Sequence, residues 1–242
     1  MIPESHEPIV RRKLSDEVFD RLKAMIVGGE CSPGETLPSE RELMARFGVG
    51  RPAIREAMQA LANLGLVTIS HGERARVRQL TAESAMRQLD PVAQLLLSTS
   101  PESLEHLKEA RSFFERGMVR RAAEVATAED VADLREIHAR QEAAAGDAPA
   151  FIRADMAFHT RVAQVTGNPI YVAVSEMMLG WLQEYHTHML IWQGRSDQTL
   201  AEHAEVIDRI EAHDPDGAEQ ALTRHLARSN HLYAHRESGA AG

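Results

Sequence analysis

The chain has 242 residues, of which 43% are hydrophobic and 26% are charged, a composition that supports one or two folded domains and argues against a disordered chain. Its single cysteine, Cys31, excludes an internal disulfide bond and is typical of a protein of the reducing cytoplasm. No apolar run approaches the ~18 residues of a membrane span, and the first residues, MIPESHEPIVRRKL, lack the apolar core of a secretory signal.

The net charge of −9 argues at first against binding to nucleic acid, but this charge is unevenly distributed. Residues 1–78 hold 12 basic and 11 acidic residues, whereas residues 79–242 hold 15 and 25. Ten of the 12 histidines lie after residue 100. The acidic charge therefore belongs to the C-terminal part of the chain and does not exclude DNA binding by the N-terminal part.

The N-terminal part predicts three helices. Apolar residues follow helical spacing over 13–28, where Ser15 is a candidate N-cap. A second helix begins in PSERELMARFG, in which Ser39 and Glu42 have the spacing of a capping box. The third spans 51–65, with a proline in its first turn and a glycine at its end.

A strand–turn–strand pattern, LVTIS-HGER-ARVRQ, follows the third helix and predicts a small hairpin. Three helices and a hairpin are the order of a winged helix-turn-helix, in which the third helix enters the major groove of DNA. The polar face of this helix presents groups able to contact phosphates and base edges, although an ordinary solvated face is the alternative. The candidate DNA contacts on the second helix, the third helix and the hairpin turn are Arg41, Arg51, Arg55, Gln59, His71 and Gly72.

Almost every later segment has helical spacing. The predicted helices are 82–98, 101–126, 128–144, 148–166, 169–192, 197–213 and 215–233. The expected fold class is mainly α, with an N-terminal winged helix-turn-helix and a C-terminal all-helical bundle. The expected domains are a DNA-binding domain in 1–78, a linker and first helix in 79–100, and a metal- and effector-binding domain in 101–235.

One acid and one imidazole lie four residues apart in FIRADMAFHT, and therefore on one helix face: Asp155 and His159. Alone, this pair indicates a side-chain hydrogen bond as readily as half of a metal site. His203 and His225 lie on the apolar faces of two later helices, and three imidazoles with one carboxylate suit zinc or nickel better than calcium or magnesium. The sequence does not show that these helices converge, and the competing candidates are His186, His188, His213, His231 and His235.

The stretch PGETLPSERELMARFGVGRPAIREAMQALANLGLVTISHG resembles the winged-helix domain of the GntR family of bacterial transcription regulators. The resemblance implies that a set of basic residues and the His-Gly of the hairpin contact DNA, namely Arg41, Arg51, Arg55, His71 and Gly72. Several relatives carry a hydroxyl residue before the first arginine of the recognition helix. This chain has Gly50 there, so a phosphate contact at that position would come from the backbone.

Residues 80–232 resemble the FCD effector domain of the FadR subfamily within GntR. Metal-binding members of that group have Asp-x-x-x-His on one helix and one histidine on each of two later helices. The resemblance therefore implies Asp155, His159, His203 and His225 as ligands of one divalent metal, most readily zinc.

The same resemblance implies a small carboxylate effector held near the metal. Arg111 in KEARSFFE and Asn168 in TGNP match pocket residues of the family; the alternatives are an ion pair of Arg111 with Glu115 and a turn cap by Asn168. The segments HGERARV, AFIRADMAFH and AHDPDGAEQALTRHL also resemble regulators of sialic acid catabolism, which implies N-acetylneuraminate as the effector. Another organic or sugar acid is the alternative.

These observations predict a ligand-responsive, metal-dependent transcription regulator that is not an enzyme. By family expectation it is a repressor, and it binds a two-fold operator as a homodimer, with no role for a membrane. A metallohydrolase is a remote alternative, in which Glu202, Glu176 or Glu184 would be the general base, but no H-E-x-x-H motif supports it. In a third hypothesis the metal itself is the signal, or it only stabilises the fold.

Overall fold

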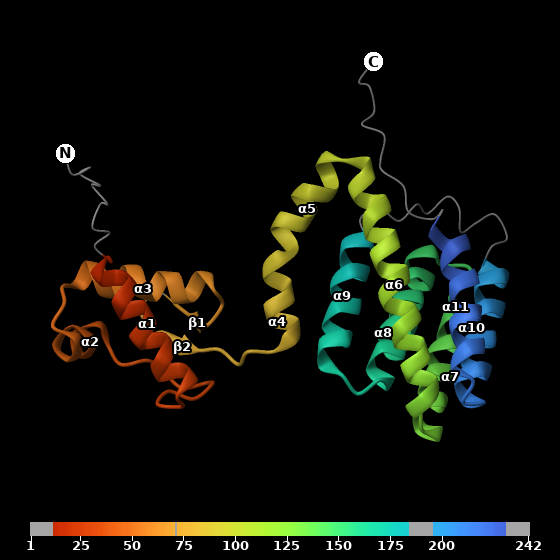
Figure 1. The fold of residues 1–242 in the computed structure, drawn as a ribbon, viewed down its shortest axis with the longest axis horizontal. Helices are drawn as coiled ribbons and strands as arrows, with labels where there is room; N and C mark the ends of the chain where they lie inside the picture. Colours follow the sequence, from red (N-terminus) through yellow and green to blue (C-terminus); the bar gives the residue numbers. More distant parts are fainter. Residues whose placement is uncertain (1–11, 71, 184–195, 231–242) are drawn as a thin grey trace, which may run out of the picture. The chain divides into compact units, whose positions relative to one another are not determined.

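The computed structural model describes residues 12–70, 72–183 and 196–230. The chain divides into two compact units, Met1–Gln88 and Leu89–Gly242. In Figure 1 the described part of the first unit combines short helices with a small hairpin, and that of the second unit is helical. Within the described ranges, no helix is long and apolar enough to cross a membrane.

Three helices form the core of the first unit, and their apolar faces meet. Leu22, Leu43, Ile54 and Leu61 are fully buried between them and the hairpin, and burial of a side chain of this size stabilises a fold by about 1.5–3 kcal/mol. The helices are α1 (Leu14–Val27), α2 (Glu40–Phe47) and α3 (Arg51–Asn63).

Of the two N-caps predicted for this unit, the structure confirms one and contradicts the other. The capping box of α2 is confirmed: the Ser39 hydroxyl accepts the Glu42 backbone N–H, and the Glu42 carboxylate accepts the Ser39 N–H at 2.7 Å. The predicted Ser15 cap is wrong. Helix α1 begins at Leu14, so Ser15 lies inside the helix, where it is buried, and Lys13 occupies the N-cap position without a side-chain hydrogen bond.

The hairpin consists of β1 (Val67–Thr68) and β2 (Arg76–Val77), which pair antiparallel with Val67 opposite Val77. Both strands are shorter than predicted. A bridge between Thr36 and Arg76 adds a third extended segment, drawn from the loop before α2. This contact joins residues 40 positions apart, so the local alternation of the sequence could not reveal it.

The predicted helix 82–98 is wrong as a single element. The structure has α4 (Ala82–Met86), a 3-10 turn η1 (Arg87–Leu89) and α5 (Asp90–Thr99). Pro91 lies in the first turn of α5, and a proline can start a helix but cannot continue one, because it lacks an N–H and crowds the preceding turn.

The second unit is a bundle in which α6 packs against α8, α9 and α11, and α10 packs against α7 and α11 (Figure 1). Its main helices agree with the predicted segments to within a few residues, although the predicted ends of 169–192 and 215–233 lie outside the described residues. These helices are α6 (Pro101–Val125), α7 (Ala128–Ala143), α8 (Ala148–Val165), α9 (Pro169–Gln183), α10 (Ser196–Glu211) and α11 (Pro215–Ser229).

The core of this bundle surrounds the candidate metal ligands. Phe158, next to His159 in sequence, is fully buried, and its ring stacks on the imidazole of His203 with centroids 3.9 Å apart. Leu222 and Leu226 are buried on the same helix as His225. The apolar helix faces therefore point these three histidines into the interior, where water does not replace a missing partner.

Candidate metal centre and DNA-contact surface

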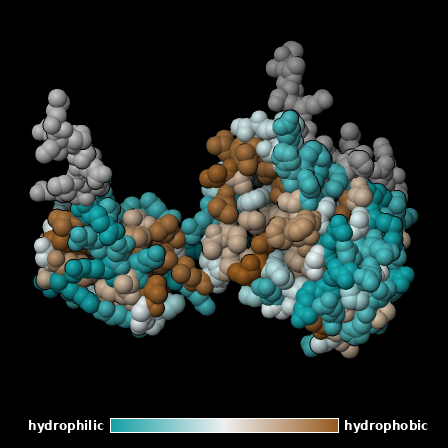
Figure 2. All heavy atoms as spheres, in the orientation of Figure 1, coloured by the Kyte–Doolittle hydropathy of each residue, from teal (hydrophilic) through white to brown (hydrophobic). Residues whose placement is uncertain are grey.

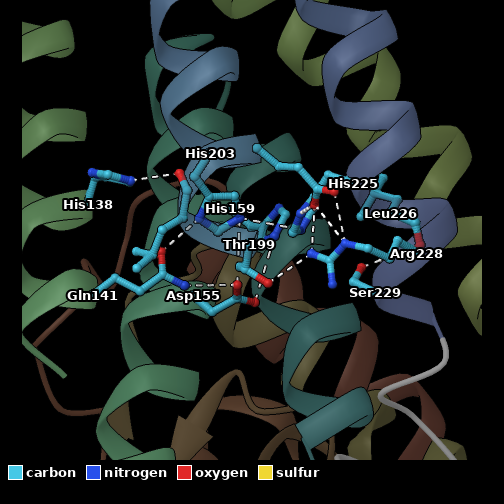
Figure 3. Close-up of polar contacts among 12 residues, drawn as sticks. His138, Gln141, Asp155, His159, Thr199, His203, His225, Leu226, Arg228 and Ser229 are labelled. Atoms are coloured by element: carbon cyan, nitrogen blue, oxygen red, sulfur yellow. Dashed lines mark hydrogen bonds and ion pairs between the residues drawn. The ribbon is translucent and has the colours of Figure 1, made fainter. Parts of the chain in front are cut away.

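Four side chains from three helices meet inside the second unit (Figure 3). Asp155 and His159 come from α8, His203 from α10 and His225 from α11. Each offers one ligand atom, and these four atoms all lie within 4.8 Å of one another. The three imidazoles are buried and the carboxylate is half-buried, so the helices converge as the resemblance implies.

The Nε2 atoms of the histidines point into this cluster. His203 Nε2 lies 3.3 Å from His225 Nε2 and 3.6 Å from Asp155 Oδ1. His159 Nε2 lies 3.8 Å from Asp155 Oδ2, and it is a buried atom without a hydrogen-bond partner among the described residues. A buried imidazole nitrogen without a partner is costly unless something else binds it.

Two carboxylates hold the outer nitrogens of two of these rings. His159 Nδ1 lies 2.6 Å from Glu115 Oε2, and His225 Nδ1 lies 2.9 Å from Glu202 Oε2. The contact of His225 is a hydrogen bond to a carboxylate, so this ring carries its hydrogen on Nδ1 and presents a lone pair on Nε2. The contact of His159 with Glu115 is a close ion-pair distance without hydrogen-bond geometry. Carboxylate–histidine pairs of this kind orient the ligands of protein metal sites.

The side-chain amide of Gln141 contacts the outer nitrogen of the third ring, that of His203. The Oε1 atom of Gln141 lies 2.8 Å from His203 Nδ1, and its Nε2 donates to Asp155 Oδ1 at 3.1 Å. Gln141 is fully buried on α7. One side chain therefore fixes both the tautomer of His203 and the orientation of the carboxylate.

Arginines that contact Glu115 and Glu202 keep these two carboxylates ionised. Burial alone would raise the pKa of Glu115, but Arg111 and His159 beside it lower that pKa to about 2. Burial likewise opposes ionisation of Glu202, yet hydrogen bonds from His225 and Arg228 lower its pKa to about 2. Both carboxylates stay ionised at neutral pH, so both remain acceptors for the histidine Nδ1–H groups.

Two of the imidazoles, His203 and His225, are held neutral. Burial lowers the pKa of His203 well below its usual range, and the neighbouring His225 and His159 lower it further. Burial also lowers the pKa of His225, although Glu202 partly offsets this effect. A histidine must be neutral to bind a metal, so the environment holds both rings in the ligating form before any ion arrives.

The donor set fits a divalent transition metal. Three imidazoles and one carboxylate are ligands that zinc accepts, and the outer nitrogens of His203 and His225 are already hydrogen-bonded. Bound there, such an ion supplies a Lewis-acid centre able to take an oxygen ligand of a small molecule. The part of the chain that the structure describes therefore contains a candidate metal centre with oriented ligands.

The first unit carries the candidate DNA contacts on its surface. Arg51, Arg55 and Gln59 are exposed along one face of α3. Arg55 Nε donates to Glu40 Oε1 at 2.8 Å, and Arg51 Nε lies 3.4 Å from Glu40 Oε2. Gln59 donates to Asn63 at 3.0 Å.

The other predicted contacts lie on α2 and the hairpin. Arg41 is exposed in the first turn of α2. Gly72 is exposed in the hairpin turn with φ +77°, a conformation that favours glycine. The predicted contact at His71 lies outside the described residues.

Both units match models of known protein families. The model of the bacterial regulatory proteins of the gntR family matches residues 14–77, and that of the FCD domain matches residues 106–228. The chain belongs to the GntR family of bacterial regulatory proteins. It carries an FCD domain as its second unit, as the motifs predict.

Two similar relatives are HTH-type transcriptional repressors named NanR. Those from Enterobacter sp. (strain 638) and Salmonella newport (strain SL254) are each 40% identical over 228 residues, covering 90% of this chain and 85% of each relative. Because the relatives are transcription regulators, this GntR protein is a regulator and not an enzyme.

Solved structures share the architecture. A GntR protein of Streptococcus agalactiae is 25% identical, with a TM-score of 0.71 over 90% of this chain and 99% of that chain. E. coli McbR/YncC is 18% identical, with a TM-score of 0.50 over 90% of this chain and 96% of that chain, which shows the fold alone. The mainly α fold class with an N-terminal helix-turn-helix is confirmed.

The two predicted effector contacts of this GntR regulator lie in different places. Arg111 is buried on α6, and its Nε donates to Glu115, the partner of His159. Asn168 accepts the backbone N–H of Ile170 at 3.0 Å at the start of α9 and lines a surface groove that also includes Tyr171. Both structural alternatives, the ion pair and the turn cap, are present, and effector binding by these residues stays a prediction.

The competing histidines are mostly outside the described residues, which hold only one of them. His213 Nδ1 lies 2.9 Å from the Ala123 carbonyl oxygen, and His213 is not part of the candidate metal cluster. His186, His188, His231 and His235 are not among the described residues. Glu202, considered as a general base for a hydrolase, is instead bound to His225 and Arg228.

Sequence reasoning missed the role of the outer partners. Gln141 carried a usable signal, because it continues the apolar stripe of Val131, Leu134 and Ile137 on α7 and a polar residue on such a stripe needs a buried partner. Glu115 appeared only as the partner of Arg111, and its contact with His159 links residues 44 positions apart on two helices. No local pattern predicts that contact.

Proposed function

We propose that this GntR protein is a transcription repressor whose binding to operator DNA is controlled by a small organic acid held at a zinc ion in the FCD unit. The observation that carries the proposal is the buried cluster of Asp155, His159, His203 and His225, with the outer nitrogen of each imidazole already engaged. Ligands oriented in this way suit an ion that stays bound while a further oxygen ligand exchanges.

Repression and the identity of the acid rest on similarity. The relatives at 40% identity are named repressors, so we assign the same sign of regulation to this chain. The motifs shared with regulators of sialic acid catabolism make N-acetylneuraminate the first acid to test. Its carboxylate would supply the oxygen ligand, and Arg111 remains a candidate for a second contact with it.

A homodimer is the proposed DNA-binding form, since a two-fold protein matches two operator half-sites. In the second unit, Val92, Leu95 and Leu96 on α5 are 60–70% exposed, and Figure 2 shows apolar residues gathered over this helix, in contrast with the hydrophilic surface of α10 and α11. An exposed apolar patch of this kind supports a protein partner. We place the regulator in the cytoplasm, where its operator DNA lies.

The test is operator binding under four conditions. DNA fragments selected from a random pool by the purified protein provide the operator, and fluorescence anisotropy then measures affinity with and without zinc and with and without N-acetylneuraminate. We expect the acid to weaken operator binding only when zinc is present. The effector can shift the DNA affinity only by its differential affinity for the two states of the protein.

The alternatives predict other results. A metal sensor would change its DNA affinity with zinc at fixed acid concentration. A purely structural zinc would raise the melting temperature without any effect of acid on DNA binding. Failure to enrich any DNA sequence would refute the regulator–operator part of the proposal.

A further inference from the structure

We propose that Glu40 is a positioning residue for sequence recognition, which presets the two arginines of α3 for reading DNA. One carboxylate contacts both guanidinium groups: Oε1 accepts the Nε–H of Arg55 at 2.8 Å, and Oε2 lies 3.4 Å from Nε of Arg51. Arg51 and Arg55 are four residues apart, so they lie on the same face of the recognition helix. This inference rests on the proposed binding of this face to operator DNA.

The atom that Glu40 binds matters for what Arg55 can do next. The hydrogen bond uses Nε–H and none of the terminal N–H groups of the guanidinium. The terminal groups are the ones that can reach the O6 and N7 acceptors of a guanine end-on. Holding Nε therefore selects one orientation of the planar group and reduces the side-chain entropy that Arg55 loses when it binds a base.

Glu40 is the fixed member of this cluster. Its side chain is 31% exposed, whereas those of Arg51 and Arg55 are 58% and 65% exposed. It is the first residue of α2, directly after Ser39, whose capping box with Glu42 defines the helix start. The carboxylate thus extends from a defined backbone position, and the longer arginine side chains gather on it.

The charge of Glu40 has the opposite effect on DNA affinity. A carboxylate beside the phosphate backbone repels it and weakens binding to any sequence. Positioning of Arg55 strengthens binding only to sequences that offer the right base edge. The two effects separate experimentally, because one acts on all duplexes and the other on the operator alone.

The test compares Glu40→Gln with a charge-matched control, Glu56→Gln. Glu56 is exposed on the same recognition helix, and its ion-pair contact is with Lys13 at 3.8 Å rather than with the two arginines. Both substitutions remove one negative charge. Anisotropy measures the affinity of the full-length protein for the selected operator and for a scrambled duplex at one fixed salt concentration, since affinities at different salt are not comparable.

For Glu40→Gln we expect operator affinity to fall about tenfold, as expected for a misplaced bidentate base contact, while affinity for the scrambled duplex rises about twofold through the lost repulsion. Glu56→Gln should raise both affinities by a similar small factor and leave their ratio unchanged. A second variant, Glu40→Asp, keeps the charge but shortens the reach. It should lose operator affinity with no change on the scrambled duplex.

Several results would overturn the proposal. If Glu40→Gln raises both affinities together, as its control does, Glu40 only repels DNA. If Glu40→Asp retains full operator affinity, the reach of the carboxylate does not matter. A wild-type protein that does not distinguish the operator from the scrambled duplex would instead refute the proposed function, which separates that failure from this one.

Discussion

On the recognition helix of the first unit, the side chains of Arg51 and Arg55 are more than half exposed, and one carboxylate contacts both. In the second unit, the imidazoles of His203 and His225 are at most 1% exposed, and each outer nitrogen has its own acceptor. Exposed cations can exchange a carboxylate for a phosphate at little desolvation cost. Buried ligands must be oriented in advance, because no water replaces a lost partner.

Among the variants that separate the two sites, removal of one buried metal ligand should have the largest effect, and that effect is on zinc binding. We expect His203→Ala to weaken zinc binding by more than about 100-fold, since it deletes a ligand rather than an outer partner. The melting temperature should no longer rise with zinc, a gain worth about 4 kcal/mol in the parent protein at zinc concentrations near 1,000 times its dissociation constant. Isothermal titration calorimetry and thermal melts measure both effects.

The matched control for that variant is His106→Ala, which removes an exposed histidine from the same unit. It should bind zinc as the parent protein does. His203→Ala should keep its operator affinity in the absence of effector and lose the response to acid. A full response to acid in His203→Ala would place the effector site elsewhere.

Removal of one exposed arginine should affect DNA alone. Arg55→Ala should weaken operator binding by about 10- to 100-fold, because a bidentate base contact and a cation are lost. Zinc affinity should stay unchanged, as the two units hold separate sites. Arg46→Ala serves as the control: it removes an equally charged side chain from α2, where Arg46 pairs with Glu30. Equal loss of operator and zinc binding in Arg55→Ala would indicate misfolding instead.

Loss of an outer partner tests how far the buried site depends on orientation. Gln141→Ala frees both His203 and Asp155 without touching the ligand atoms, and we expect zinc affinity to fall about tenfold. The control is Gln164→Ala, an exposed glutamine on α8. Unchanged zinc affinity in Gln141→Ala, measured by competition with a chelator, would show that packing alone sets the geometry.

The smallest expected effect is a pH dependence of stability in the zinc-free protein. The folded-state pKa values of His203 and His225 are lowered by burial, so below about pH 6.5 the unfolded chain binds protons that the folded chain does not. The free energy of unfolding should therefore decrease by about 1 kcal/mol between pH 7 and pH 6. Urea denaturation of chelator-treated protein measures it, and His203→Ala should show a shallower dependence. Stability that rises on acidification would contradict the buried, neutral state of these rings.

Much of the exposed site and of the helix pattern was predictable because the signals are local. The capping box of Ser39 and Glu42 and the arginine face of α3 depend on residues a few positions apart. The failures are also local in cause. Pro91 splits a helix that apolar spacing alone extends across it, and Ser15 is buried inside α1 although its residue type favours a cap.

In the buried site, the ligands could be predicted from the sequence, but their hydrogen-bonding and ion-pair partners could not. The resemblance implied its four ligands, but their partners Glu115, Gln141 and Glu202 join helices that are distant in sequence. A buried carboxylate or amide does not indicate which nitrogen it will hold. Those contacts follow from helix packing and therefore became visible only in the fold.

The measurement that tests the central claim most directly is anomalous X-ray diffraction at the zinc edge from crystals of the zinc-loaded protein. Oriented Nδ1–H groups predict one zinc ion per chain, bound by Nε2 of His159, His203 and His225 and by Asp155 at about 2.0–2.2 Å. An anomalous peak away from these four side chains, or ligation of zinc through Nδ1, would contradict the proposed centre and the role of its outer partners.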